Sequence, residues 1–146
     1  MSATIEDRAT FSTRNGHARC LLCGEQNPAS LKLRFVAGSG GTVSAKFKSH
    51  AGLQGYNDVL HGGVIAALMD SAMTHCLFHH GVQGLTGDLH VRYLRPVSCG
   101  ATVEIRAAIV SSRPPLYVLK AELLLQEAVM ARAEAKFMQR DAAVPG

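Results

Sequence analysis

One long apolar segment constrains the fold of this chain more than any other feature. Apolar residues recur in it at the i, i+1, i+4, i+5 spacing of a helix that packs against a core. They are Val64, Ile65, Leu68, Met69, Ala72, Met73, Cys76 and Leu77. Because such a helix must bury its apolar stripe, the rest of the chain has to supply a surface that covers it.

Period-two alternation on both sides of this helix predicts six half-buried strands. Two runs precede the helix, at residues 31–35 and 43–47, and four follow it, at residues 85–93, 103–109, 119–125 and 129–137. Short turns between the last four runs predict antiparallel pairing, and a sheet with one apolar face needs a partner on that face. The expected fold class is α+β, in the order β-β-α-β-β-β-β, with a curved antiparallel sheet wrapped around the long central helix.

Length and composition predict one globular domain. The 146 residues are 47% hydrophobic and 18% charged, which suits a single core. We expect a flexible leader at 1–19, one domain at 20–140 and a tail at 141–146. The net charge of +4 is dispersed and Trp is absent, which disfavours nucleic acid as a partner. No apolar run is long enough to span a membrane and no secretion signal is visible, so a cytoplasmic location is expected.

The four cysteines are expected to be reduced thiols, because they lack the dense spacing of a disulfide scaffold. Cys20 and Cys23 form a C-x-x-C pair that looks like half of a zinc knuckle. A second C-x-x-C or an H-x-x-x-H that would complete tetrahedral coordination is missing. The sequence therefore favours no metal site.

Three segments carry a resemblance to a known family. They are residues 55–63 (GYNDVLHGG), the helix end 68–70 (LMD) and residues 86–97 (TGDLHVRYLRPV), with residues 23–35 as a similar lead-in. Over about residues 20–139 the chain resembles the hotdog-fold thioesterase superfamily, in particular its hydroxybenzoyl-CoA and phenylacetate-pathway thioesterase branch. The resemblance implies hydrolysis of an acyl-CoA thioester to a free acid and coenzyme A, with no cofactor beyond the substrate's own coenzyme A.

The resemblance also assigns the candidate catalytic residues. Asp70 matches the helix carboxylate that attacks the thioester carbonyl or activates a water. The amide of Gly62, together with that of Gly63, matches the oxyanion site at the positive end of the helix. His61 is expected to fix the loop by hydrogen bonding. Thr74, one turn after Asp70, is expected to orient the carboxylate or a water.

Further polar residues are candidates for substrate binding. Thr86 matches a hydroxyl that positions water in some relatives, and relatives often carry an amide near Gln54 or Asn57 that contacts the thioester carbonyl. The sequence does not show which basic residues would meet the phosphates of coenzyme A.

The spacing of Gly62 and Asp70 predicts a homodimer. Eight residues of helix separate them by about 12 Å, so one carbonyl group cannot touch both. If both act on one thioester, the acid and the amide come from two chains, in a dimer or a dimer of dimers. Small residues beside Asp70 would allow two helices to approach.

Three other interpretations stay open. Asp70 could be an interface acid paired with an arginine. The chain could be a non-catalytic module that binds acyl-CoA. It could also be an enoyl-CoA hydratase, since His75 lies five residues after Asp70, as in one branch of the superfamily. Release of free thiol against hydration of crotonyl-CoA separates the two enzymes.

Overall fold

The structure is a computed structural model, and it describes residues 16–140. These residues divide into two compact units, one ending at Arg34 and one beginning at Phe35. Most of the expected leader and the expected tail lie outside the described residues. Within the part of the chain that is described, no helix is long and apolar enough to cross a membrane.

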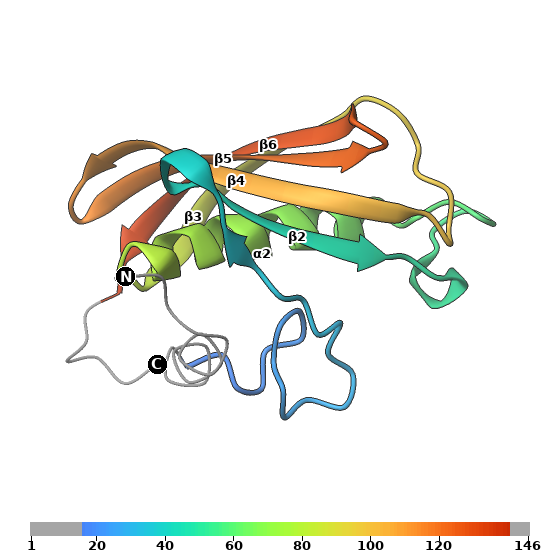
Figure 1. Cartoon of the computed structure of the whole chain (residues 1–146), viewed down its shortest axis with the longest axis horizontal. Helices are drawn as coiled ribbons and strands as arrows, with labels where there is room; N and C mark the ends of the chain where they lie inside the picture. Colours follow the sequence, from blue (N-terminus) through green and yellow to red (C-terminus); the bar gives the residue numbers. More distant parts are fainter. Residues whose placement is uncertain (1–15, 141–146) are drawn as a thin grey trace. The chain divides into compact units, whose positions relative to one another are not determined.

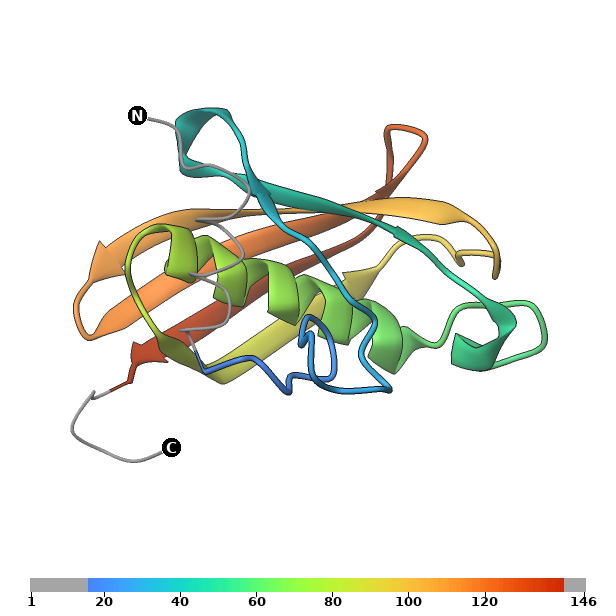
Figure 2. The same ribbon diagram turned by 60° about the horizontal axis from the view of Figure 1, so that its bottom comes forward.

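Among residues 16–140, all of the regular secondary structure lies in the second unit. Its elements are β1 (Val36–Ala37), η1 (Ser39–Gly41), β2 (Val43–Lys48), η2 (Ala51–Leu53), α2 (Gly62–His79), β3 (Gly84–Tyr93), β4 (Thr102–Arg113), β5 (Leu116–Leu125) and β6 (Ala128–Gln139). The order of six strands and one long helix agrees with the prediction. Within this unit the curved sheet wraps around α2, as the hotdog fold requires (Figures 1 and 2).

The sheet is antiparallel, and its spatial order is β1-β2-β4-β5-β6-β3. The hairpins β4–β5 and β5–β6 form between consecutive strands, as the short turns predicted. Strand β3 does not pair with its successor β4. It pairs with β6 instead, so that Leu89 lies opposite Ala135 at the far edge of the sheet.

The core lies between α2 and the inner face of the sheet. The largest side chains with almost no exposure come from the helix (Leu68, Met69, Met73, Leu77) and from the strands (Ile105, Leu119, Leu123, Phe137). Every residue from Ser71 to Phe78 is buried, including the polar Thr74 and His75. The helix residues that keep some exposure therefore lie mostly in its first half.

The strand expected at residues 31–35 is not formed, which corrects the sequence prediction. Lys32 has a φ of 57°, which the extended backbone of a strand does not allow. Its ammonium group donates to the carbonyl oxygens of Gly24 (3.2 Å) and Glu25 (2.8 Å). Before β2, the only strand in the described residues is the two-residue β1, which pairs with β2.

Candidate active site on helix α2

Helix α2 starts at Gly62 because His61 caps it. The Nδ1 atom of His61 accepts a hydrogen bond from the amide of Gly63 at 2.8 Å, which satisfies one of the unpaired N–H groups of the first turn. His61 therefore holds the turn by hydrogen bonding. The same bond occupies the Gly63 amide, which leaves Gly62 as the better oxyanion donor of the two glycines.

Tyr93 also holds the start of this helix. Its hydroxyl donates to the carbonyl oxygen of Gly62 at 2.6 Å. A Cβ added to Gly62 would lie 3.5 Å from the Tyr93 ring, which is ordinary van der Waals contact. Within this chain, then, the Gly62 position does not itself exclude a side chain.

An open hollow of about 340 Å³ borders the start of the helix. Tyr56, whose side chain is 87% exposed, lines it together with His61 and Gly62. The expected binding residue Gln54 belongs to the same loop, where its side-chain oxygen accepts from the amide of Asp58 at 3.1 Å. Asn57 is exposed in the turn that follows Gln54.

Asp70 lies two turns further along α2 and is partly buried. The Oγ1 atom of Thr86 on β3 donates to Asp70 Oδ1 at 2.6 Å, a short hydrogen bond to a carboxylate. The hydroxyl thus fixes one carboxylate oxygen. The position of the acid is therefore determined by both the helix, which carries Asp70, and the sheet, which carries Thr86. Thr74 was expected to orient the carboxylate of Asp70 or a water. Its hydroxyl instead donates to the backbone carbonyl of Asp70 at 2.9 Å.

An irregularity in β3 explains why Thr86 faces the helix. The pairing with β6 shifts between Thr86 and Asp88, so Gly87 is an extra residue in the ladder. Such a bulge reverses the alternation of side chains on one side of it. Leu85, expected in the core, is accordingly 62% exposed, and Thr86 points to the helix.

His75 is placed among aromatic rings. Its ring stacks on Phe35 with centroids 4.7 Å apart and meets Phe78 edge-on at 5.0 Å. The histidine required for a hydratase would have to face the substrate near Asp70. The buried position between two phenyl rings does not favour that role.

Helix α2 carries two groups that could act on a carbonyl group, and they lie at separate points along it. Gly62 and Asp70 belong to one uninterrupted helix, so about 12 Å of helix separates them. One end offers a backbone amide at a helix N-terminus, which stabilises developing negative charge. The other offers a positioned carboxylate. Sequence reasoning proposed both points but missed the Tyr93 contact, whose only signal was a tyrosine at the end of a strand.

A second hollow, of about 490 Å³, lies on the sheet. Its lining includes the basic side chains Arg92, Lys120 and Arg132 and the acidic side chains Glu122 and Glu134. The mixture of both charges makes it a less suitable pocket for the phosphates of coenzyme A than a purely basic surface would be.

Three comparisons relate this geometry to known proteins. The first structural match, a thioesterase superfamily protein, is 22% identical with a TM-score of 0.74; the alignment covers 79% of this chain and 60% of that one. The chain thus spans less than two thirds of that protein. A mutant of the phenylacetic acid degradation protein PaaI from Thermus thermophilus is 23% identical with a TM-score of 0.69, covering 75% and 95%.

A Streptococcus mutans protein solved with acetyl-CoA is 20% identical with a TM-score of 0.69, covering 74% and 88% of the two chains. A comparison with curated protein sequences finds no match. The sequence model of the thioesterase superfamily matches residues 57–135, more than half of the chain, and this span includes the helix start, Asp70 and Thr86. The chain belongs to the thioesterase superfamily.

Proposed function

We propose that the chain is an acyl-CoA thioesterase in which Asp70 performs the chemistry. The observation that carries the proposal is the 2.6 Å hydrogen bond from Thr86 to Asp70, because it positions the single acid of an otherwise uncharged helix face. Membership of the thioesterase superfamily supports the reaction class. Structural neighbours solved with acetyl-CoA and with coenzyme A support the substrate class.

In the proposed reaction, Asp70 attacks the thioester carbonyl or removes a proton from a water that attacks it. The carbonyl oxygen becomes an oxyanion and accepts a hydrogen bond from the Gly62 amide. The C–S bond then breaks, and coenzyme A leaves as a thiolate. If Asp70 is the nucleophile, water then hydrolyses the mixed anhydride, which releases the acid and regenerates the carboxylate. The reaction consumes one water and yields a free acid, and it requires no cofactor.

The proposed site is shared by two chains. Since the Gly62 amide and the Asp70 carboxylate lie too far apart on one helix to meet one carbonyl, the amide of one copy would act with the acid of another. The proposed assembly is a homodimer, alone or within a dimer of dimers.

Replacement of Asp70 by Asn tests the chemistry. With a panel of aromatic and medium-chain acyl-CoA esters and a thiol reagent, Asp70→Asn should lower kcat/KM by about 10²- to 10⁴-fold on the best substrate. Asp88→Asn, the same substitution at an exposed carboxylate on β3, should retain activity. Unchanged turnover in Asp70→Asn would remove the acid from the mechanism.

The same panel separates the alternatives. A wild-type chain that binds acyl-CoA without releasing thiol would be a binding module. Hydration of crotonyl-CoA without thiol release would indicate a hydratase.

A further inference from the structure

Residues 16–34, the described part of the first unit, carry an unusual set of side chains. The described part of this unit has turns but no helix or strand. Three strong ligands for soft metal ions, His17, Cys20 and Cys23, lie within one turn-rich stretch. With His17, the C-x-x-C pair becomes H-x-x-C-x-x-C, which supplies three ligands instead of two.

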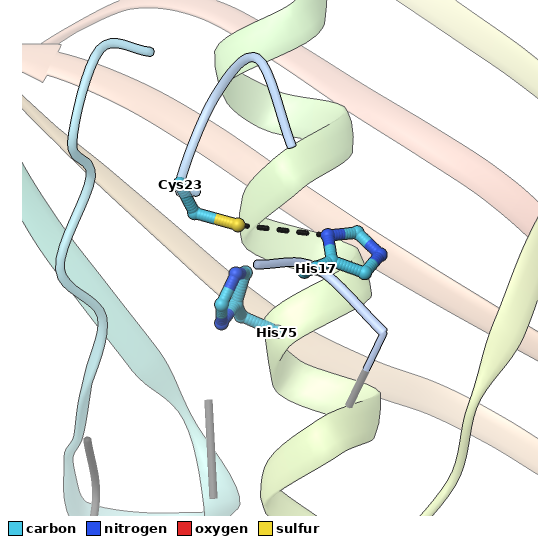
Figure 3. Close-up of side chains that lie close together, drawn as sticks. All are labelled: His17, Cys23 and His75. Atoms are coloured by element: carbon cyan, nitrogen blue, oxygen red, sulfur yellow. Dashed lines mark hydrogen bonds between the residues drawn. The ribbon is translucent and has the colours of Figure 1, made fainter. Parts of the chain in front are cut away.

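The structure places the side chains of His17 and Cys23 in contact, and the Cys20 side chain lies beside Cys23. Cys23 Sγ lies 3.5 Å from His17 Nδ1 (Figure 3). Burial is the larger cause of the raised pKa of the Cys23 thiol, and Cys20 lies close enough to raise it further. All four cysteines of the chain are free thiols, so neither sulfur is committed to a disulfide.

The distance fits a shared metal ion. Zinc binds sulfur at about 2.3 Å and imidazole nitrogen at about 2.0 Å, and at a tetrahedral angle these lengths place the two ligand atoms about 3.5 Å apart. The separation of Cys23 Sγ and His17 Nδ1 therefore already matches that of two ligands on one zinc ion, so the two atoms need not move apart to admit it.

One backbone amide is placed to support a thiolate on Cys20. The amide of Leu22 donates to Cys20 Sγ at 3.3 Å, and a hydrogen bond of this kind stabilises negative charge on sulfur. The chain turns tightly after Cys23, because the amide of Gly24 donates to the Cys20 carbonyl at 2.8 Å. A Cβ at Gly24 would clash with the Cys20 backbone nitrogen and lie 2.7 Å from the Ala18 carbonyl oxygen, so only glycine fits there.

We propose that His17, Cys20 and Cys23 bind one zinc ion, which has a structural role in the unit of residues 16–34. On binding, both thiols release their protons and the imidazole coordinates through Nδ1, with a further donor or water in the fourth position. The ion supplies cross-links that a short irregular segment cannot obtain from a core of its own. This proposal is independent of the proposed thioesterase reaction.

Metal content of the full-length chain is the direct test. The protein is expressed with zinc in the medium and purified under reducing conditions without a polyhistidine tag. We expect about one zinc per chain by elemental mass spectrometry. Cys20→Ser and Cys23→Ser should each retain less than about a tenth of it, because two ligands hold zinc poorly. Cys99→Ser, the same substitution at a cysteine outside the cluster, should retain all of it.

Two further variants test the geometry. His17→Gln should raise the dissociation constant for zinc at least about tenfold. Gly24→Ala leaves all three ligands in place but cannot adopt the turn, so it too should bind zinc more weakly. Circular dichroism checks that each variant keeps the fold of the second unit.

Cobalt gives a readout that does not depend on stability. Cobalt added to the metal-free wild type should produce the sulfur-to-cobalt charge-transfer band of tetrahedral thiolate coordination, and Cys20→Ser should weaken it. Wild-type protein that holds no stoichiometric zinc after reduction and reconstitution would overturn the proposal. Full zinc content in both cysteine variants would also overturn it.

Discussion

Thr86 on β3 donates a 2.6 Å hydrogen bond to the carboxylate of Asp70 on α2, and this contact joins the sheet to the helix at the candidate acid. The bond depends on the bulge at Gly87, since regular alternation would turn Thr86 away from the helix. A hydroxyl at residue 86 is therefore a positioning group for Asp70.

Removal of that hydroxyl should impair hydrolysis without unfolding the chain. Thr86→Val has nearly the same shape and loses only the donor, and hydrogen bonds to charged groups contribute about 1.5–3 kcal/mol. We expect kcat/KM to fall about 10- to 100-fold in steady-state thiol-release assays. Thr86→Ser keeps the donor and should stay within a few-fold of wild type. Equal activity of the valine and wild-type proteins would show that the bond does not serve catalysis.

The shared site predicts complementation between two inactive variants. Gly62→Pro removes the proposed oxyanion donor, and the helix should tolerate proline at its first position. The preceding His61 has φ −60° and ψ 132°, a conformation that residues before proline favour. Asp70→Asn removes the acid.

In a mixed dimer, one of the two sites would combine an intact Gly62 with an intact Asp70. Co-refolding equal amounts of Gly62→Pro and Asp70→Asn should restore up to about a quarter of wild-type activity, since half of the dimers are mixed and each has one intact site. Each variant refolded alone is the control. No recovery despite proven mixed dimers, or full activity in a strictly monomeric wild type, would place both groups in one chain.

The sequence predicted the long elements well because their periodic patterns are local. α2 and the four strands that follow it lie within a few residues of their expected positions. The Asp70–Thr86 contact was not predictable in this way. It depends on β3 pairing with β6, far along the chain, and on a bulge that reverses the side-chain alternation.

The first expected strand failed for a related reason. Alternation of leucines with Lys32 suggested extended backbone, but Lys32 adopts a left-handed conformation, and its ammonium group donates to three carbonyl oxygens. The cluster of His17 with Cys23 was missed because a single C-x-x-C pair gives little indication of a third ligand.

Tyr93 should stabilise the start of α2. Tyr93→Phe removes the hydrogen bond to the Gly62 carbonyl and keeps the ring. A neutral hydrogen bond contributes about 0.5–1.5 kcal/mol, and the half-exposed position of Tyr93 places the effect at the lower end. Urea denaturation should show this loss as a lower midpoint with an unchanged slope. Tyr56→Phe, at a far more exposed tyrosine, is the control, and an identical midpoint in Tyr93→Phe would contradict the stabilising role.

Cys76 should be inert at neutral pH although it is a free thiol. Burial raises the pKa of Cys76 from 9.0 to about 11, because the thiolate would lose its hydration inside the core. At pH 8 only about one thiol in a thousand would be ionised, and the thiolate is the reactive form.

Alkylation followed by peptide mass spectrometry tests this directly. In the folded chain, iodoacetamide should label the partly exposed Cys99 and spare Cys76, and both should react in denaturant. The raised pKa also determines whether the free energy of unfolding rises or falls with pH. The unfolded chain ionises first, so this thiol lowers the free energy of unfolding as pH rises from about 9 towards 11. Cys76→Ala should flatten that decline, and rapid labelling of native Cys76 at pH 8 would contradict the buried, neutral thiol.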